Sequence, residues 1–228
     1  SYEKGAPGVL LADDMGLGKT LESLAFHAAL LEHKPDSRVL IVAPTALIRN
    51  WQDEMEIHFR ENAFGRVLAL NGNRLKQFKQ LEGNDISTNR AVLDPAIADY
   101  NVLLTTYETL RDYQQSFGAI KFDLAIFDEA QKIKTPNVAI TLAAKAMNID
   151  FCLAMTGTPI ENRLADIWSI IDRAHPGYLE DLRTFSDRFE RRADDEEALS
   201  ELNNLLTSTR ENNSVPQIMM RRMKTDHL

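Results

Sequence analysis

The sequence predicts an open, doubly wound α/β fold built on a mainly parallel sheet. Short apolar runs recur through the first two-thirds of the chain, and most are continuously hydrophobic, as in strands buried on both faces of such a sheet. Helical patterns separate these runs, and alternating strands and helices imply right-handed crossover connections. The length of 228 residues allows one sizeable α/β domain or two small ones.

Each predicted element follows from its own pattern. The first helix rests on Leu21, Leu24 and Leu31, which share one stripe of a 3.6-residue period. The polar stretch 71–99 is predicted as a helix with an irregular excursion. The strands are predicted over 8–12, 38–43, 66–70, 101–106, 122–127 and 151–155, and the helices over 19–33, 45–59 and 137–147.

Beyond residue 160 the sequence predicts amphipathic helices and no further strand. We therefore divide the chain into a sheet domain over 1–160 and a helical extension over 161–228. The abrupt start, in which "SYEKGAPG" leads directly into an apolar run, suggests a fragment of a longer protein.

Bulk composition excludes several classes of protein. The net charge of −8 argues weakly against a surface coated for nucleic acid, although a local basic groove stays open. Cys152 is the single cysteine, so an internal disulfide is excluded, and its apolar run predicts a small core residue in a reducing compartment. No apolar stretch approaches the ~20 residues of a membrane span, and we expect a soluble intracellular domain without membrane partners.

The segment "LADDMGLGKT" predicts a phosphate-binding loop between a strand and a helix. Gly16 and Gly18, on either side of Leu17, allow backbone N–H groups to converge on an anion at the helix N-terminus. Lys19 would reach the β- and γ-phosphates of a nucleotide, and the Thr20 hydroxyl would complete a Mg²⁺ shell. The strict GxxxxGK[ST] pattern has glycine where this chain has Asp13. The alternative is a glycine turn with a surface lysine.

An acidic pair closes a later strand in "FDLAIFDEAQKIK". Ligands of doubly wound sheets bind beyond the carboxyl ends of the strands, where Asp128 and Glu129 would lie. Asp128 is predicted to hold Mg²⁺ through a water, and Glu129 to orient or deprotonate the water that attacks the γ-phosphate. Solvated loop acids and a P-loop kinase are the alternatives, but two successive acids favour hydrolysis because water needs a base.

Three further strand ends carry polar residues. In "LAMTGTPIEN", Thr156 and Thr158 offer hydroxyls around a tight turn at Gly157 and Pro159, which either senses the γ-phosphate or is an ordinary strand-to-helix connection. In "VAPTALIRNW", polar residues precede Trp51, which we predict to be a core anchor. "TTYETLRD" repeats hydroxyl residues at a strand end, and the basic "MMRRMK" is a linker or a phosphate contact.

In this order, the segments resemble the first ATPase lobe of the Swi/Snf class of superfamily-two helicase-like motors. The matching segments are "DDMGLGKT", "LIVAPTALIRNW", "LLTTYETL", "FDEAQKIK" and "LAMTGTPIEN", followed by "LADIWSIIDRAHPGYL" and "MMRRMKTD". The resemblance implies a RecA-like fold of the P-loop NTPase class, ATP hydrolysis with Mg²⁺, and translocation along double-stranded DNA that remodels or displaces DNA-bound proteins.

The resemblance also implies roles for individual residues. Gln131 stands where many relatives carry histidine; it is expected to bridge to the following motif and favours a prokaryotic, cytoplasmic source over a nuclear one. Thr156, Gly157 and Thr158 are implied in coupling. The residues implied in lining the DNA groove are Thr45, Asn50, Thr106 and Tyr107.

Two parts of the family pattern are missing from this sequence, namely the upstream glutamine that reads adenine and the second lobe with its arginine fingers. An arginine finger is worth roughly 10³–10⁵ in rate, so this lobe alone is expected to be nearly inactive. Two alternatives stay open. One is a nucleotide-binding or interaction module without turnover, and the other is a lobe of an RNA or strand-separating helicase of the same superfamily.

Asp13 and Asp14 stand directly before a loop that binds anions. The resemblance implies that an acidic pair is normal here, with Asp14 where many members carry glutamate. We expect both carboxylates to face away from the phosphates and to hold the loop, either through backbone N–H groups or by pairing with a basic group.

Overall fold

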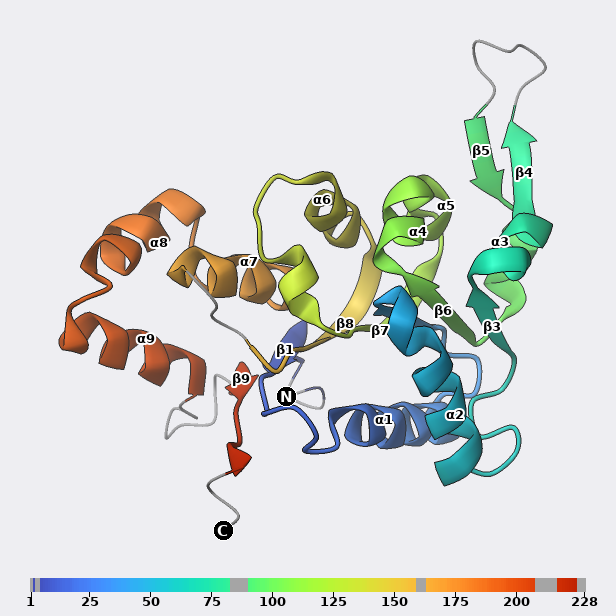
Figure 1. Ribbon diagram of the computed structural model, residues 1–228, viewed down its shortest axis with the longest axis horizontal. Coiled ribbons are helices and arrows are strands. Elements are labelled where there is room, and N and C mark those ends of the chain that lie inside the picture. The colour runs from blue at the N-terminus through green and yellow to red at the C-terminus, as the bar shows by residue number, and fades with distance from the viewer. Residues whose placement is uncertain (1, 3–4, 83–89, 159–162, 208–216, 225–228) are drawn as a thin grey trace. The chain divides into compact units, whose positions relative to one another are not determined.

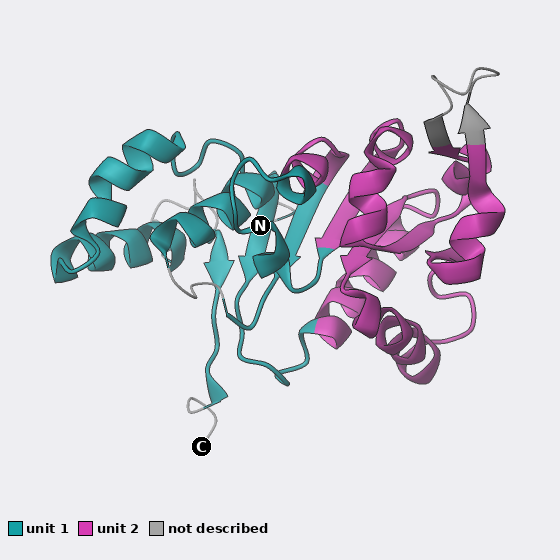
Figure 2. Cartoon of the chain, turned by 45° about the horizontal axis from the view of Figure 1, so that its top comes forward, with its two compact units in different colours: residues 1–19, 127–141, 151–228 teal, residues 20–126, 142–150 magenta. Residues whose placement is uncertain are grey.

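Parallel strands alternate with helices in the computed structural model, as the sequence predicts (Figure 1). The structure describes residues 2, 5–82, 90–158, 163–207 and 217–224. The chain divides into two units that interleave along the sequence (Figure 2). Unit 1 comprises Ser1–Lys19, Phe127–Thr141 and Phe151–Leu228, and unit 2 comprises Thr20–Ile126 and Leu142–Asp150.

The strands of unit 2 follow the order β3-β6-β2-β7. The β2 and β6 strands pair in parallel from Val39↔Val102 to Ala43↔Thr106, and every residue of both is buried, which explains their continuous apolar runs. The β3 strand pairs in parallel on the other side of β6. The strand bounds are Val39–Ala43 (β2), Val67–Leu70 (β3), Val102–Thr106 (β6) and Lys121–Phe127 (β7).

The helices predicted over 19–33, 45–59 and 137–147 are present close to those ranges, and two further helices, over 107–112 and 114–118, were not predicted. The helix predicted over 45–59 is a 3₁₀ turn at Thr45–Leu47 followed by an α-helix, and Trp51 on that helix is fully buried, which confirms it as a core anchor. The helix bounds are Lys19–His33 (α1), Ile48–His58 (α2), Gly72–Phe78 (α3), Tyr107–Asp112 (α4), Gln114–Gly118 (α5) and Ala139–Lys145 (α6).

The stretch predicted as a helix with an irregular excursion contains the helix, α3, and the excursion includes a β-hairpin that the sequence did not predict. After α3, strands β4 (Lys79–Glu82) and β5 (Arg90–Leu93) pair antiparallel from Lys79↔Leu93, and a 3₁₀ turn follows at Pro95–Asp99. The connection between the two strands lies outside the described residues. The sequence of these strands lacks a period-2 apolar face, so no strand signal was present.

The strands of unit 1 follow the order β8-β1-β9, with bounds Gly8–Leu11 (β1), Asn148–Met155 (β8) and Met219–Met220 (β9). Both pairings of β1 are parallel. A Cβ at Gly8 would lie 2.2 Å from the Ala174 carbonyl oxygen, so only glycine fits this close approach. Cys152 on β8 is 2% exposed, which confirms the predicted core residue.

The expectation that no strand follows residue 160 is wrong, because β9 pairs with β1. Two methionines followed by basic residues carry no strand periodicity; the free edge of β1 supplies the hydrogen bonds. The predicted helices do follow: α7 (Leu164–Ala174), α8 (Leu182–Arg188) and α9 (Glu196–Thr207) (Figure 1). Pro159 and the predicted division at 160 lie at residues outside the described part.

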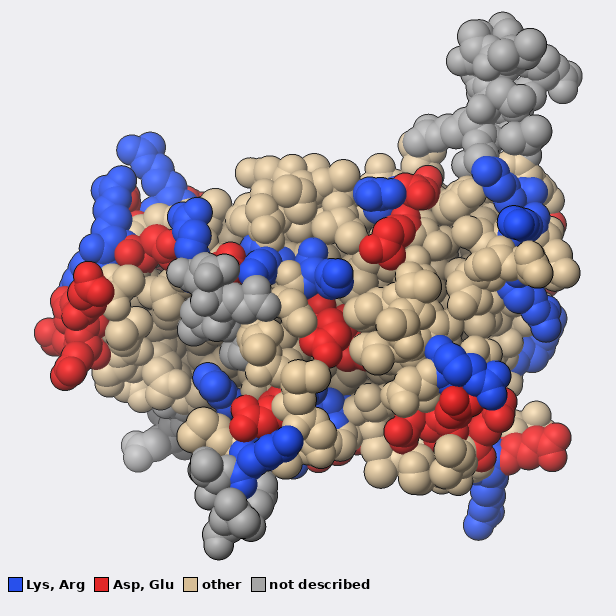
Figure 3. Space-filling view, in the orientation of Figure 1, with Lys and Arg blue, Asp and Glu red and all other residues tan. Residues whose placement is uncertain are grey.

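Charged residues of both signs are interspersed over the face shown in Figure 3. Within the described part of the chain, no helix combines the length and apolar character needed to cross a membrane.

Candidate nucleotide site

The phosphate loop connects the end of β1 at Leu11 to the start of α1 at Lys19. Gly16 and Gly18 have φ of +83° and +84°, a backbone conformation that strains any L side chain. Between them, Leu17 donates its N–H to the Asp14 carbonyl oxygen at 3.4 Å. The loop therefore turns through its glycines into the N-terminus of a fifteen-residue helix, which is the backbone arrangement that binds anions.

Lys19 is held inside this loop. Its ammonium donates to the carbonyl oxygens of Asp13, at 2.6 Å, and of Asp14, at 3.0 Å. The positive charge is thus fixed beside the glycine turn by two backbone acceptors. Thr20 follows as the first residue of unit 2, and its carbonyl oxygen accepts the Ser23 hydroxyl at 2.7 Å.

The carboxylates of Asp13 and Asp14 are occupied by the C-terminal segment. Asp13 is fully buried and accepts hydrogen bonds from the backbone N–H of Arg222 at 2.7 Å, from its Nε at 2.8 Å and from its Nη2. Asp14 accepts the backbone N–H of Lys224 at 3.1 Å. This confirms the expectation that the acids support the loop. Sequence reasoning missed Arg222, which lies 209 positions from Asp13, and the basic run "MMRRMK" was its sole signal.

The acidic pair, Asp128 and Glu129, directly follows the last residue of β7, Phe127. Both residues belong to unit 1, like the phosphate loop. Asp128 is 7% exposed, and its Oδ1 accepts the backbone N–H of Glu129 at 3.0 Å. Glu129 adopts a left-handed conformation with φ of 50°, which costs about 1–3 kcal/mol in a residue other than glycine. Such strain persists where the surrounding structure holds the residue in this conformation.

A chain of hydrogen bonds connects Glu129 to the segment after β8. The Gln131 amide nitrogen donates to Glu129 Oε2 at 2.7 Å, and the Gln131 amide oxygen accepts the Thr156 hydroxyl at 2.7 Å. Thr156 is fully buried, and its hydroxyl oxygen accepts the backbone N–H of Thr158 at 3.1 Å. Gln131 therefore joins the acidic pair to the Thr156 turn.

Gly157 brings the same turn against the phosphate loop. A Cβ at Gly157 would lie 2.7 Å from Met15 Cγ and 3.9 Å from the Asp13 carbonyl oxygen, so the turn and the loop pack closely. Unit 1 thus gathers three predicted segments that are far apart in sequence, at residues 13–19, 128–131 and 156–158. Thr158 is exposed at the end of the described part of this turn.

The residues predicted to line a DNA groove lie in unit 2 and differ in exposure. Thr45 and Asn50 are exposed on the 3₁₀ turn and on α2. Thr106 is buried, and its hydroxyl oxygen accepts the Thr109 N–H at 3.1 Å, which caps α4. Tyr107 is fully buried.

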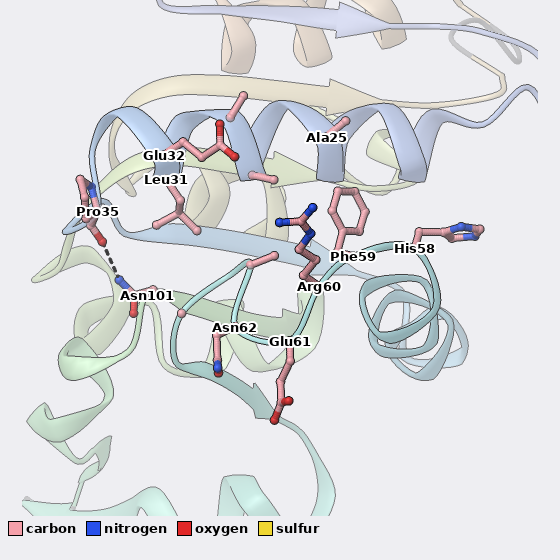
Figure 4. A pocket seen from close by; sticks show the side chains of 14 residues that line it. Ala25, Leu31, Glu32, Pro35, His58, Phe59, Arg60, Glu61, Asn62 and Asn101 are labelled. Carbon is pink, nitrogen blue, oxygen red and sulfur yellow. Dashed lines mark hydrogen bonds between the residues drawn. The ribbon is translucent and has the colours of Figure 1, made fainter.

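Unit 2 also has a hollow of about 910 Å³ beside α1 (Figure 4). The loop after α2 faces the small residues of α1 across this hollow, and Asn101 donates to the Pro35 carbonyl oxygen at 3.2 Å on its rim. None of the residues predicted to bind nucleotide or DNA lines it. Its lining includes Ala25, Ala28, Ala29, Leu31, Glu32, His58, Phe59, Arg60, Glu61 and Asn62.

A glycine loop with a lysine between the first strand and its helix, and an acidic pair closing a later parallel strand, define a P-loop nucleotide-binding domain. Residues 1–227 match the model of the SNF2-related domain, and the chain belongs to this family.

Solved structures with a similar fold come from the archaeon Sulfolobus solfataricus. Its SWI2/SNF2 ATPase core in complex with dsDNA is 28% identical to this chain and matches it with a TM-score of 0.74. The match covers 99% of this chain and 42% of that chain. A second structure, of the SWI2/SNF2 ATPase core domain from the same organism, has a TM-score of 0.70 at 28% identity and covers 97% of this chain and 40% of that chain. The fold is therefore RecA-like, and the chain is an ATPase core lobe of the Snf2 type.

Relatives by sequence come from bacteria and from animals. They include Zorya protein ZorD of Escherichia coli (41% identical, 83% of this chain, 18% of the relative) and a Mycoplasma genitalium ATP-dependent helicase (36%, 83% and 17%). Human DNA excision repair protein ERCC-6-like is 35% identical over 83% of this chain and 14% of its own length. The chain thus spans less than a fifth of each of these relatives.

Proposed function

We propose that this chain is the ATP-binding lobe of a DNA-stimulated ATPase that moves along double-stranded DNA and remodels protein–DNA complexes. The observation that carries the proposal is the hydrogen-bonded chain from Glu129 through Gln131 to Thr156, within the same unit as the phosphate loop. A solvated loop acid has no need of an amide that fixes its carboxylate, whereas a base that must orient a water does.

The roles of the residues follow from their positions. Gly16, Leu17 and Gly18 form the turn that binds the phosphates through backbone N–H groups, and the Leu17 N–H must leave the Asp14 carbonyl oxygen to take part. Lys19 binds the β- and γ-phosphates as a point charge beside this turn. Glu129 orients the attacking water and accepts its proton, and Gln131 holds the Glu129 carboxylate in one orientation. Water is thereby activated next to the bond that breaks, between the γ-phosphorus and the bridging oxygen.

The residue types proposed to bind a metal ion suit Mg²⁺. The ion prefers oxygen ligands, keeps several waters, and is bound through one or two carboxylates and substrate phosphates. Thr20 supplies a hydroxyl, and Asp128 supplies a carboxylate of which one oxygen is engaged by the Glu129 N–H. When bound, Mg²⁺ neutralises charge that develops on the phosphate oxygens. Asp128 and Thr20 are the residues that would hold it.

Coupling is proposed to run through the Thr156 turn. Thr156 contacts Gln131 through its hydroxyl, and Gly157 packs against Met15 of the phosphate loop. A change at the γ-phosphate therefore reaches Thr156, Gly157 and Thr158 through contacts that already exist. Thr158 is exposed and offers this change to another surface.

Double-stranded DNA is the proposed partner. The similar Sulfolobus core is described in complex with dsDNA, and Thr45 and Asn50 present polar side chains on an exposed helix start. Thr106 and Tyr107 are proposed to shape this region from beneath. DNA-bound proteins are the proposed targets of remodelling. A prokaryotic cytoplasm is the proposed compartment, on the ground of Gln131 where many relatives carry histidine. We retain 1–160 as the ATP-binding lobe and 161–228 as its helical extension.

The substitution E129Q in the full-length gene product tests the proposal. It keeps the size of the side chain and one oxygen that can accept from Gln131 while removing the base. ATP binding is therefore expected to stay within about threefold and hydrolysis to fall by roughly 10²–10⁴. Fluorescent-ATP titration and steady-state phosphate release measure the two quantities. Unchanged turnover in E129Q would refute the role of Glu129.

A strand-separating or RNA helicase of the same superfamily is the second candidate. The relatives from two Mycoplasma species carry the name ATP-dependent helicase. The two candidates differ in which nucleic acid stimulates ATP hydrolysis. A module without turnover, the third candidate, would bind ATP and release no phosphate with any nucleic acid.

A further inference from the structure

The phosphate loop continues the pairing of β1 with the C-terminal segment beyond the end of the strand. Along β1 and into the loop, every second N–H donates to a carbonyl oxygen of that segment. The three bonds are Leu10 to Ile218 at 2.8 Å, Ala12 to Met220 at 2.7 Å and Asp14 to Arg222 at 3.1 Å. The first half of the phosphate loop is thus hydrogen-bonded as part of the sheet.

Asp13 lies between two of these bonds and is fully buried. An ionised carboxylate in such a place is costly unless it is paired and hydrogen-bonded. The Asp13 carboxylate accepts three hydrogen bonds from described residues. All three come from Arg222, through its backbone N–H, Nε and Nη2. The strict GxxxxGK[ST] pattern has glycine at the position of Asp13. The buried pair of Asp13 and Arg222 is therefore not required by that pattern and is a feature of this loop.

The same residue is also bonded to the lysine that binds phosphate. The backbone carbonyl oxygen of Asp13 accepts the Lys19 ammonium at 2.6 Å, and that of Asp14 accepts it at 3.0 Å. Asp13 therefore contacts Arg222 through its side chain and Lys19 through its backbone. Asp14 repeats the arrangement, because its carboxylate accepts the Lys224 N–H.

We propose that Arg222 is a positioning residue of the nucleotide site, which sets the place of the Lys19 ammonium by holding Asp13. The proposal rests on the function proposed above, in that the loop must bind ATP. Moving the segment 218–224 displaces Asp13 and Asp14, and with them the two carbonyl oxygens that hold Lys19. ATP affinity consequently depends on Arg222, which lies 209 positions away from Asp13 in the sequence.

Arginine is suited to this role in a way that lysine is not. Its Nε and Nη2 both reach Asp13 Oδ2 from one planar group, which fixes the orientation of the carboxylate as well as its charge. The ammonium in R222K supplies the charge without this geometry. R222K is therefore expected to weaken ATP binding less than R222Q.

The decisive experiment is a double-mutant cycle between Arg222 and Lys19 in the full-length gene product. The variants are R222Q, K19A, the double variant R222Q/K19A, and R221Q as the matched control. Arg221 is the exposed neighbour, and R221Q removes the same charge without touching the bonds to Asp13. The measurement is the Kd for a fluorescent ATP analogue with Mg²⁺, alongside circular dichroism to verify folding.

R222Q is expected to raise the Kd at least about tenfold and R221Q less than about twofold. In the K19A background, R222Q is expected to add less than about twofold, because Arg222 acts through Lys19. A merely structural effect of R222Q would instead add to K19A in full. Additive effects, or equal effects of R222Q and R221Q, overturn the proposal.

If R222Q does not fold, the same cycle with R222K decides by the same criterion. The two proposals fail in different ways. If the wild-type protein binds no ATP, or K19A binds it equally well, the proposed function is wrong. If wild-type binding is normal and K19A weakens it measurably while R222Q and R222K bind as wild type, only the positioning role is wrong.

Discussion

The buried polar side chains of two motifs in unit 1 differ from one buried histidine of unit 2. In unit 1, Asp13 and Thr156 are fully buried, and each is hydrogen-bonded to another residue of a predicted motif. In unit 2, His27 is equally buried on α1, yet neither ring nitrogen has a hydrogen-bond partner among the described residues. Its ring packs against Phe64, with 4.9 Å between centroids.

This difference indicates which buried polar groups transmit a change and which only shape the core. A partnered group such as Thr156 connects segments, so its substitution should alter the function of residues that it does not replace. An unpartnered imidazole such as His27 connects nothing by hydrogen bonding, and its cost should appear in stability alone. The following predictions test this contrast, from the largest expected effect to the smallest.

The largest effect is expected for H27L, which should weaken the pH dependence of the free energy of unfolding in acid. Burial lowers the pKa of His27 to about 3, below the value near 6.5 of an unfolded chain. As the pH falls from 6.5 towards 3, the unfolded state takes up the proton and the folded state does not. The wild type therefore loses about 1.4 kcal/mol per pH unit, on the order of 5 kcal/mol over the whole range, and H27L does not lose this part.

Urea denaturation of wild type and H27L between pH 7 and pH 4 measures this difference. H33L is the matched control, since His33 is an exposed histidine at the end of the same helix. H33L is expected to keep the pH dependence of the wild type. Parallel profiles for the wild type and H27L would show that His27 is not buried in its neutral form.

The next effect concerns the hydrogen-bonded chain of unit 1. T156V removes the hydroxyl that holds Gln131 and leaves the amide oxygen without that donor, a loss of about 1–3 kcal/mol. If this loss appears in the transition state, kcat for ATP falls roughly 10- to 100-fold while ATP affinity changes little. Steady-state kinetics and ATP titration of the full-length protein separate the two.

T141V is the control for that experiment. Thr141 is also fully buried in unit 1, but its hydroxyl donates to the Thr135 carbonyl oxygen and not to a predicted motif. T141V should lose a similar amount of stability and keep kcat. Equal kcat losses in T156V and T141V would mean that the Thr156 contact is structural.

A smaller effect, on the free energy of unfolding, is expected for Thr106, the buried residue that caps α4. T106V removes the cap of α4 and should lower the free energy of unfolding by about 1 kcal/mol, within the range of 0.5–2 kcal/mol for such caps. Chemical denaturation measures this. A loss of DNA affinity in T106V without any loss of stability would contradict the role of Thr106 as a cap.

The smallest effect is expected at the exposed Asn50. If its amide bonds to a DNA phosphate, N50A loses about 0.5–1.5 kcal/mol of binding, or roughly 2- to 10-fold in Kd, with stability unchanged within about 0.5 kcal/mol. Duplex-DNA binding by fluorescence anisotropy measures it. Q52A, two positions on and hence on another face of α2, is the control, and equal effects of both would remove Asn50 from the interface.

The sequence predicted what local patterns encode. The continuous apolar runs of β2 and β6 located buried parallel strands, and the glycines with Lys19 located the phosphate loop, because each signal lies within about ten residues. Asp13 and Asp14 were recognised as loop supports for the same reason, since a nearby lysine and helix already supply the positive field.

The rest depended on contacts that the sequence does not order. Arg222 reaches Asp13 from 209 positions away, and nothing in a basic run says which arginine faces the loop. The strand β9 exists because β1 has a free edge, not because two methionines favour it. The burial of His27 was also invisible, because a histidine beside alanines on a helix can face either side.

The central claim is that this lobe belongs to an ATPase driven by double-stranded DNA. The most direct test is steady-state ATP hydrolysis by the full-length protein with duplex DNA, single-stranded DNA and RNA at matched nucleotide concentration. We predict that duplex DNA stimulates hydrolysis at least about tenfold over the rate without nucleic acid, a barrier change of about 1.4 kcal/mol or more, and that E129Q abolishes the stimulated rate. Stimulation by single strands or RNA but not by duplex DNA would contradict the claim.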